Sequence, residues 1–384
     1  MIITELVLKV ASVCNLNCSY CYVFNKGDHS YATEPNFLDK NLIDVILTKI
    51  NRYCKKHEIA NFIIIFHGGE PLLIGKDFYI HFINRATELV TSTRLIYTLQ
   101  TNGTLLTKSW CELLSNLNIG IGVSLDGPAE ASKYRIFKST LAPAHNEIIK
   151  GFEILSNTQD KTAILTVINV DESPDVLYEY FKSLNVNELD LLFPDANHDK
   201  KDKAVGRLGG WLIQFFKIWY NDTNEQKPGI RLFIEIIKLF LFDEYKGYDP
   251  MGRIFNGIIT VKPNGNIEPV DALRICGSEF MHTGLNIKDN NIEDIESNII
   301  LKRFYYAHQD NELCNICQCC IIKKICGGSQ LSHRYSELNE FDNPSVYCND
   351  IIELVVFIQN ALYEDIPELK ILGMERLTHD DFSN

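Results

Sequence analysis

Three cysteines close to the start of the chain form the first group of residues able to do chemistry. Cys14, Cys18 and Cys21 are separated by three and then two residues, directly after an apolar run. Three thiolates at this spacing can bind three irons of a [4Fe–4S] cluster and leave the fourth iron open to an external ligand. A structural zinc site or three reactive thiols are the alternatives, but zinc sites usually draw ligand pairs from two places, and no second pair lies nearby.

A second group of seven cysteines lies between Cys276 and Cys348, within the last 109 residues (276–384). In a reducing cytosol, clustered cysteines indicate metal or cluster ligands before disulfides. Cys54 and Cys111 stand alone inside helix-like patterns, where a buried packing role is expected. The sequence therefore predicts a second metal-binding region toward the C-terminus.

Polar motifs follow several apolar runs. Gly68-Gly69-Glu70-Pro71 follows the second run; its glycines let the backbone approach a ligand closely, and Glu70 and the exposed carbonyls can accept hydrogen bonds. Asn102 follows the third run, and Ser124 and Asp126 follow the fourth. Taken alone, such motifs are more often plain turns. Because the carboxyl ends of parallel strands meet at one face of a barrel, we expect these motifs to form one ligand site.

The elements that must position these motifs alternate over the first 200 residues between strand-like and helix-period segments. Strands are predicted at 3–11, 61–66, 94–100, 119–125, 162–170 and 188–193. Helices are predicted near 39–56, 77–89, 108–117, 145–156 and 174–184. Strands that are apolar on both faces and alternate with helices indicate parallel pairing through right-handed crossovers. The pattern predicts an α/β fold, a partial (β/α)6 barrel, with a doubly wound open sheet as the alternative.

After Phe193 the pattern changes. Helices are predicted near 211–220 and 230–242, a hairpin at 258–261 and 267–270, and a C-terminal helix near 350–363. The Asn264-Gly265 pair supports the hairpin turn, and Ser173 before Pro174 is predicted to cap the fifth helix. We place the domain boundary between roughly 200 and 250, and predict a barrel domain over 1–235 and a second domain over 236–384.

Composition excludes several classes of protein. With 46% hydrophobic and 23% charged residues, the chain of 384 residues is typical of a globular protein, not of a coiled coil or a disordered chain. The net charge is 37 − 50 = −13, which argues against nucleic-acid binding. There is no apolar run of the roughly 18 residues that a membrane span needs, and no signal peptide is recognised. A cytoplasmic protein is expected.

The cysteine triplet, with Tyr20 before its last cysteine, and the Gly-Gly-Glu-Pro loop resemble the radical S-adenosylmethionine (SAM) superfamily. The resemblance implies that the open iron chelates SAM and that electron transfer cleaves SAM to a 5′-deoxyadenosyl radical. Ser124 and Arg135 match a Ser and an Arg that contact SAM in that superfamily; a surface cation is the alternative for Arg135. The implied cofactor-binding residues are Tyr20, Gly68, Gly69, Glu70, Pro71, Asn102, Ser124, Asp126 and Arg135.

The C-terminal cysteines resemble a SPASM domain, the auxiliary-cluster module of peptide-modifying radical SAM enzymes. The match implies one complete auxiliary [4Fe–4S] cluster on Cys317, Cys320, Cys326 and Cys348. Val270 and Gln330 stand where the family pattern has cysteines. A second auxiliary cluster would have to draw on Cys276, Cys314 and Cys319, which are otherwise plain thiols. A zinc ribbon is the alternative for the whole region.

The segments 268–277, 326–335 and 341–348 together resemble the maturases that build three-residue cyclophanes in ribosomal peptides, and 18–28 looks most like their Xye branch. The resemblance implies hydrogen abstraction from the Cβ of a core-peptide residue, followed by attack of that carbon radical on an aromatic ring. Loss of one proton and one electron restores the ring; the auxiliary cluster is the candidate electron acceptor and Asp271 the candidate base. A hairpin-end cap or a salt bridge to Arg274 is the alternative role of Asp271.

The implied partners are a ribosomal precursor peptide, with leader and core, and a reductant such as flavodoxin or ferredoxin. Since Cys14 lies only 13 residues from the start, we expect the barrel, the C-terminal domain or another chain to bind the leader. A sulfatase-maturing enzyme that forms formylglycine is the second hypothesis; the missing auxiliary cysteines and the His333-Arg334-Tyr335 signature count against it. A non-catalytic electron carrier or peptide-binding scaffold is the third, and it would not need the SAM-binding strand ends.

Overall fold

The structure is a computed structural model that describes residues 1–26, 30–159 and 161–382. The chain divides into two compact units, each built from two stretches of sequence. The first unit consists of Met1–Leu165 and Gly257–Tyr305, and the second of Thr166–Asn256 and Tyr306–Asn384. The sequence predicted a single boundary at residue 235; as a functional division it stays a prediction. Residues 27 and 28, which end the 18–28 motif, lie outside the described residues.

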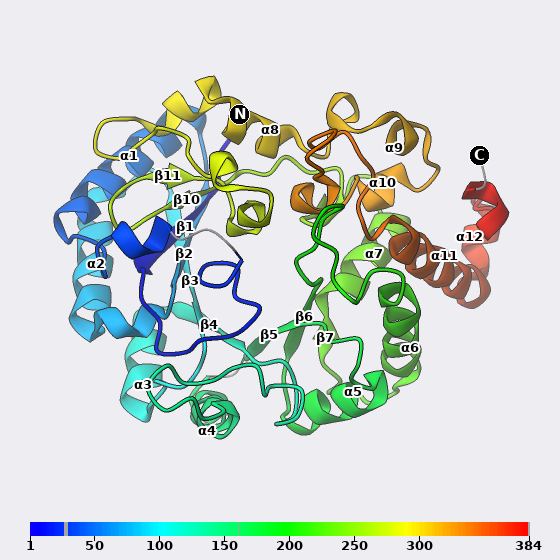
Figure 1. Ribbon diagram of the computed structural model, residues 1–384, viewed down its shortest axis with the longest axis horizontal. Coiled ribbons are helices and arrows are strands. Elements are labelled where there is room, and N and C mark those ends of the chain that lie inside the picture. Colours follow the sequence, from blue (N-terminus) through cyan, green and yellow to red (C-terminus); the bar gives the residue numbers. More distant parts are fainter. Residues whose placement is uncertain (27–29, 160, 383–384) are drawn as a thin grey trace. The chain divides into compact units, whose positions relative to one another are not determined.

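The first unit is built on a mostly parallel sheet. Its strands are β1 (Glu5–Ala11), β2 (Asn61–Gly68), β3 (Arg94–Thr101), β4 (Ile119–Ser124), the start of β5 (Ala163–Val167), β10 (Ile258–Val261) and β11 (Ile267–Glu268). The strand order is β11-β10-β1-β2-β3-β4-β5 (Figure 1), and only the β10–β11 pair is antiparallel in this series. A doubly wound sheet reverses its order at a switch point. Because β1 to β5 follow chain order, the predicted barrel-type α/β fold is confirmed.

Helices connect these strands, and each helix turns its apolar face toward the protein core. They are α1 (Asn41–His57), α2 (Lys76–Leu89), α3 (Lys108–Asn116) and α4 (His145–Ser156). In α1, Leu42, Ile46 and Ile50 recur at helical spacing and are buried. Thr107 caps α3 by accepting a hydrogen bond from the backbone N–H of Trp110 at 3.3 Å. The predicted and observed limits of β1–β4 and α1–α4 agree within two residues, because strong periodicity is a reliable signal.

The predicted hairpin is present as β10 and β11. Gly265 in its turn has a φ of +90°, a conformation that glycine adopts without a Cβ clash. The structure places β10 parallel to β1, with Val261 opposite Leu8. After two further residues a 3₁₀ helix, η3 (Asp271–Ile275), begins. The hairpin therefore brings Asp271 to the strand that leads to the first cysteine motif.

The second unit begins in β5 and is mainly helical. Its first part contains α5 (Pro174–Ser183), β6 (Glu188–Leu192), α6 (Leu208–Asn221), β7 (Gly229–Ile230), α7 (Arg231–Leu241), β8 (Gly247–Tyr248) and β9 (Met251–Gly252). After α8 (Ile299–Tyr306), which crosses from the first unit, follow α9 (Asn315–Cys319), α10 (Lys323–Cys326), the 3₁₀ helix η7 (Leu331–Arg334), α11 (Cys348–Asp365) and α12 (Pro367–Ile371). Among the described helices, none is long and apolar enough to cross a lipid bilayer.

One predicted detail of α5 is wrong. Ser173 occupies the N-cap position with an extended backbone, but its side chain does not cap the helix. Its hydroxyl donates instead to the carboxylate of Asp175 at 3.4 Å. A serine at a helix start can bond to a nearby side chain as well as to the helix backbone, and here the local carboxylate wins.

Candidate functional site

The loop after β1 gathers the three N-terminal cysteines. The backbone N–H of Cys21 donates to the carbonyl of Cys18 at 3.0 Å, and the N–H of Leu16 donates to the Cys14 sulfur at 3.4 Å. Burial, with a smaller effect of the nearby thiols, raises the pKa of the Cys14 thiol to about 12, and burial raises that of Cys18 to about 11. The isolated thiols are therefore protonated at neutral pH, and iron binding must release their protons.

These thiols fit a cluster. Among the described residues, no three His, Cys, Asp or Glu side chains are placed to bind one common metal ion. A [4Fe–4S] cluster does not require that arrangement, because each cysteine binds a different iron. The mutual electrostatic influence of Cys14, Cys18 and Cys21 shows that the fold brings all three together.

The Gly-Gly-Glu-Pro loop packs directly on the cysteine loop. The N–H of Gly69 donates to the Ala11 carbonyl at 2.8 Å, and the N–H of Glu70 donates to the Val13 carbonyl at 2.9 Å. A Cβ added at Gly69 would lie 2.3 Å from the Val13 oxygen and 3.0 Å from the Cys14 nitrogen. Only glycine allows the two backbones to approach this closely. The loop thus sets the position of Cys14, the first of the predicted cluster ligands.

Glu70 is fully buried, and its carboxylate joins the ends of β2 and β3. It accepts hydrogen bonds from the Leu72 N–H at 3.0 Å, the Thr101 hydroxyl at 2.8 Å and the Asn102 N–H at 2.9 Å. Burial raises the pKa of Glu70 to about 7, against the effect of these donors. The structure therefore assigns Glu70 a role in holding the strand ends together, while its direct contact with SAM stays a prediction.

Asn102 links β3 to the cysteine loop through its side-chain amide. The amide NH2 donates to the Asn15 side-chain oxygen at 2.9 Å and to the Cys14 sulfur at 3.7 Å. Ser124, at the end of β4, accepts a hydrogen bond from the Gln100 side chain at 2.7 Å. Both side chains lie at carboxyl strand ends, as the barrel geometry requires for ligand-binding groups.

Arg135 is not a surface cation, and that alternative is wrong. The side chain is 6% exposed and makes a two-pronged pair with Asp126, with Nε–Oδ2 2.8 Å and Nη2–Oδ1 3.0 Å. The Tyr20 hydroxyl donates to the same carboxylate, and the guanidinium lies 5.5 Å from the Tyr20 ring centre. Arg135 also bonds to Cys18 and opposes the burial effect that raises the pKa of that thiol. Four predicted site residues therefore form one cluster, in which Asp126 and Arg135 are buried and Cys18 and Tyr20 are half-buried.

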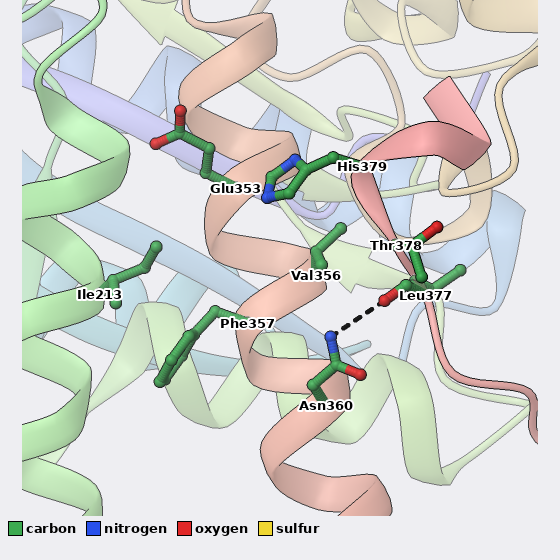
Figure 2. Close-up of a pocket in the computed structure, with 8 residues that line it drawn as sticks. All are labelled: Ile213, Glu353, Val356, Phe357, Asn360, Leu377, Thr378 and His379. Carbon is green, nitrogen blue, oxygen red and sulfur yellow. Dashed lines mark hydrogen bonds between the residues drawn. The ribbon is translucent and has the colours of Figure 1, made fainter. Parts of the chain in front are cut away.

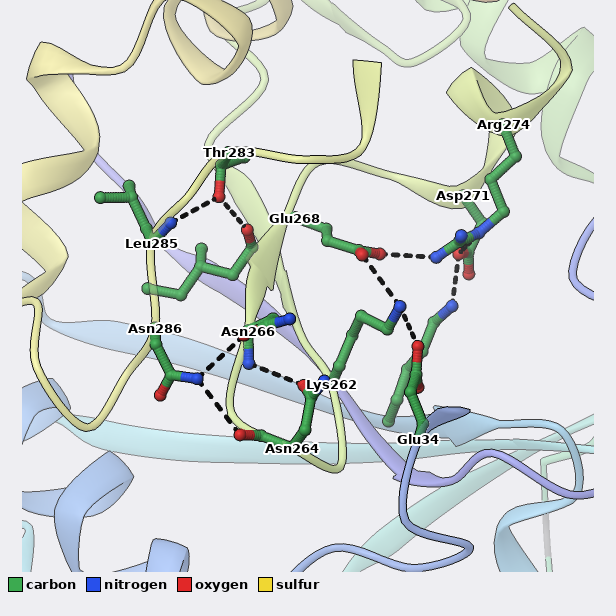
Figure 3. Close-up of polar contacts among 12 residues, drawn as sticks. Glu34, Lys262, Asn264, Asn266, Glu268, Asp271, Arg274, Thr283, Leu285 and Asn286 are labelled. Atoms are coloured by element: carbon green, nitrogen blue, oxygen red, sulfur yellow. Dashed lines mark hydrogen bonds and ion pairs between the residues drawn. The ribbon is translucent and has the colours of Figure 1, made fainter. Parts of the chain in front are cut away.

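Asp271 lies in a buried series of alternating charges, which we call the charge chain and define by Glu34, Lys262, Glu268, Arg274, Asp271 and Lys9. Figure 3 labels all of its members except Lys9. Lys9 and Arg274 both donate to Oδ1 of Asp271, Arg274 through Nε at 2.8 Å. Arg274 and Lys262 also pair with Glu268, at 2.5 and 2.9 Å. The hypothesis of an Asp271–Arg274 salt bridge is therefore confirmed as geometry, whatever further role Asp271 has.

The charge chain keeps Asp271 ionised. Burial by itself raises the pKa of this carboxyl, but the positive charges of Lys9 and Arg274 outweigh it and hold the pKa below its usual range. Burial also raises the pKa of the Cys21 thiol, and Asp271 contributes in the same direction, which places the carboxylate near the cysteine loop. Sequence reasoning missed Lys9, although a lysine inside the apolar run Glu5–Ala11 was a usable signal.

In the second unit, five cysteines influence one another: Cys314, Cys317, Cys320, Cys326 and Cys348. The set contains the four predicted auxiliary ligands. Cys314 is an addition; a hydrogen bond with Cys317 lowers the pKa of the Cys314 thiol to about 6. Cys319 is exposed, and Cys276 is buried in the first unit. Burial and the neighbouring thiols raise the pKa of Cys326 to about 12, so this thiol binds metal only on losing its proton.

A cavity of about 410 Å³ lies in the second unit between α6, α11 and the C-terminal segment. Its walls are mostly apolar, and the Asn360 side chain donates to the Leu377 carbonyl at 3.0 Å on one side (Figure 2). Residues that line it are Ile213, Glu353, Val356, Phe357, Asn360, Leu377, Thr378 and His379. None of these is a predicted cofactor or cluster residue, so this cavity is not the candidate site.

Comparison with known proteins gives a family and several relatives. The family described as the Radical SAM superfamily matches residues 8–180. The cysteine-type anaerobic sulfatase-maturating enzyme of Clostridium novyi is 27% identical over 284 residues, 70% of this chain and 73% of that protein. Two solved structures share the fold. The enzyme anSMEcpe with bound AdoMet and Cp18Cys peptide is 20% identical, with a TM-score of 0.81 over 95% of this chain and 99% of that chain. Streptococcus suis SuiB bound to precursor peptide SuiA is 17% identical, with a TM-score of 0.57 over 90% and 76%.

Proposed function

Because residues 8–180 match the family described as the Radical SAM superfamily, we propose that this chain is a radical SAM enzyme that oxidises a peptide substrate. The finer proposal is a crosslink between an aromatic side chain and the Cβ of a residue two positions later in a ribosomal precursor peptide. Solved structures of similar fold hold a bound peptide, namely Cp18Cys on anSMEcpe and SuiA on SuiB. A peptide substrate is the chemistry that these likenesses favour.

The first unit supplies the residues that would hold the cofactors. Cys14, Cys18 and Cys21 would bind the cluster, and Gly68 and Gly69 let their loop lie directly against the backbone of residues 11–14. SAM bound beside these residues would supply the radical chemistry that removes a hydrogen atom from the substrate. The buried Asp126–Arg135 pair keeps a cation and the Tyr20 ring beside Cys18, where they can orient the polar groups of SAM. Electrons for the cluster come from a partner such as flavodoxin or ferredoxin.

Asp271 is the observation that carries the finer proposal. Ring closure removes one hydrogen atom from Cβ and then one proton and one electron from the aromatic ring. Asp271 is ionised, buried and close to Cys21, and these properties support the proposal that it accepts the proton. The electron has an acceptor in the auxiliary cluster proposed on Cys317, Cys320, Cys326 and Cys348. The two ion pairs make Asp271 a weak base. It can therefore accept a proton more readily from the very acidic ring cation that oxidation of the ring radical produces than from a neutral hydroxyl group.

The experiment is a reaction of iron-loaded protein with reductant, SAM and a precursor peptide that contains aromatic-x-x motifs. We expect the peptide to lose the mass of two hydrogen atoms for each ring. Tandem mass spectrometry should show no backbone fragments inside the three-residue ring, and a hydrazine probe should give no adduct. A peptide that loses two hydrogens but fragments normally between those residues would contradict the crosslink.

Formylglycine formation is the second candidate. One observation favours it: the match to the anaerobic sulfatase-maturating enzyme of Clostridium novyi covers 73% of that protein. Oxidation of Ser also removes two hydrogen atoms, so peptide mass cannot separate the two reactions. A hydrazone on the product would establish the aldehyde and replace the crosslink with formylglycine. A non-catalytic carrier is disfavoured by the SAM-type strand ends, and formation of 5′-deoxyadenosine tests that directly.

A further inference from the structure

Arg334 is a buried cation that the proposed chemistry does not yet use. It ends η7 in the second unit and is fully buried, with 0% of its side chain exposed. Its Nη2 donates to the Ala307 carbonyl at 2.8 Å. Its Nε and Nη1 have no hydrogen-bond partner among the described residues. Buried N–H donors of a charged group are costly to leave without an acceptor, so we expect these two N–H groups to meet an acceptor that the protein binds.

The surroundings of Arg334 identify that group. A Cβ added at Gly328 would lie 3.2 Å from Nη1 and 3.5 Å from Cζ of Arg334, so the guanidinium packs against the Gly328 backbone. The N–H of Gly328 bonds to the Cys326 thiol. Arg334 interacts electrostatically with Cys317, Cys326 and Cys314, and also with the carboxylate of Asp249. The cation and its unpartnered donors therefore lie in the cysteine group proposed to hold the auxiliary cluster.

The neighbouring His333 has a different environment. Its ring stacks on Phe193 at 6.4 Å between ring centres and meets Tyr347 edge-on at 5.0 Å. Lys324 lies two residues before Cys326 and is exposed. Solvent screens an exposed charge, whereas a buried one acts at nearly full strength. Arg334 is thus the cation best placed to act on the cysteine group.

We propose that Arg334 donates its two unpartnered N–H groups to sulfurs of the auxiliary cluster and raises the reduction potential of that cluster. This inference rests on the proposed function, which places a cluster on these cysteines. A cluster on four thiolates is negatively charged and becomes more so when it takes an electron, so a buried cation stabilises the reduced form more than the oxidised form. Net charge and hydrogen bonds to sulfur are the factors that set such potentials. Arg334 would thereby favour transfer of the substrate electron to the cluster.

The test measures the midpoint potential of the auxiliary cluster by a redox titration followed by electron paramagnetic resonance. The full-length protein carries Ala at the three N-terminal cluster cysteines, so only auxiliary iron contributes. Arg334→Met removes the positive charge and its N–H donors, whereas Arg334→Lys keeps the charge but loses the planar guanidinium. Lys324→Met removes an exposed positive charge and is the matched control. We expect Arg334→Met to disfavour the reduced cluster about tenfold, a fall of about 59 mV for one electron. Arg334→Lys should show a smaller fall, and Lys324→Met no change.

A full iron content with an unchanged midpoint in Arg334→Met would overturn the inference and leave the proposed function intact. Absence of auxiliary iron in the parent protein would overturn both. If Arg334→Met does not bind iron, a second measurement on protein with native Arg334 tests the contact between Arg334 and the auxiliary cluster. With ¹⁵N-labelled arginine, the reduced auxiliary cluster should show hyperfine coupling to ¹⁵N, because a hydrogen bond transmits spin density to the donor nitrogen. Lack of that coupling would equally refute the contact.

Discussion

Replacing Asp271 by Asn tests both the charge chain and the proposed base. The six side chains of the charge chain are between 3 and 8% exposed, and three positive charges balance three negative ones. Asn keeps the shape of Asp271 and can still accept a hydrogen bond from Arg274, but it removes one negative charge. Lys9 then loses its ion-pair partner while its ammonium remains buried. The change should therefore affect stability before it affects chemistry.

The magnitude follows from removing one partner of a buried pair, which costs about 3–5 kcal/mol. Proteins are stable by only about 5–15 kcal/mol, so this is a large fraction of the free energy of unfolding. The melting temperature should fall on the order of 10 °C. A depressed pKa means that the Asp271 carboxylate contributes its stability above the unfolded pKa of about 3.9 and loses it only as pH falls through the lower folded pKa. The loss of stability should thus be the same at about pH 5 and about pH 8.

The matched control is the double variant Lys9→Met with Asp271→Asn, which removes one charge of each sign. Replacing a buried ion pair as a whole is often nearly neutral, so the double variant should recover most of the lost stability. Urea unfolding of iron-loaded protein measures all three forms. A penalty for Asp271→Asn below about 1 kcal/mol, the range of exposed pairs, would refute the interpretation of the charge chain as a tightly coupled buried network.

The same variants separate structure from catalysis when assayed below their melting temperatures. Asp271→Asn should retain 5′-deoxyadenosine formation and lose ring closure, because hydrogen abstraction precedes loss of the aromatic proton. The double variant should also lack ring closure, although its stability is restored. Crosslinking that returns in the double variant would mean that Asp271 is needed for stability only, and that the proton goes elsewhere.

Three further predictions concern the cofactor sites. Replacement of Cys14, Cys18 and Cys21 by Ala should abolish 5′-deoxyadenosine formation, measured by chromatography, while auxiliary iron remains; undiminished SAM cleavage would contradict the assignment. Iron analysis of that triple variant should give about four irons per chain, whereas about eight would indicate a second auxiliary cluster and stoichiometric zinc would exclude both. Gly69→Ala should lower the free energy of unfolding by about 1–3 kcal/mol and reduce the iron content of the first site, because the added Cβ would lie 2.3 Å from the Val13 oxygen. Gly210→Ala is the control, since a Cβ added there meets no atom within 4 Å. Equal iron contents in the two variants would refute the close-packing argument.

The sequence by itself determined the local elements and the chemical groups. Apolar runs and helical periodicity placed β1–β4 and α1–α4 within two residues, because these patterns reflect burial on one strand or helix at a time. The spacing of Cys14, Cys18 and Cys21 indicated a cluster for a similar reason. All three lie in one short loop, so their proximity depends on few backbone angles. The Asn264-Gly265 turn was equally local, since a positive φ at Gly265 suffices for it.

Only the tertiary structure decided which distant residues meet. The pairing of β10 with β1 brings Asp271 to Lys9, and the turn after β4 brings Asp126 and Arg135 to Tyr20. The roles of Glu70 and Arg334 also depended on burial, which a one-dimensional pattern does not show for a charged residue. A charged side chain in a sequence is expected in water, where screening makes its partners unimportant. Inside the fold the same charge must find a partner, and that requirement explains the contacts that sequence reasoning missed.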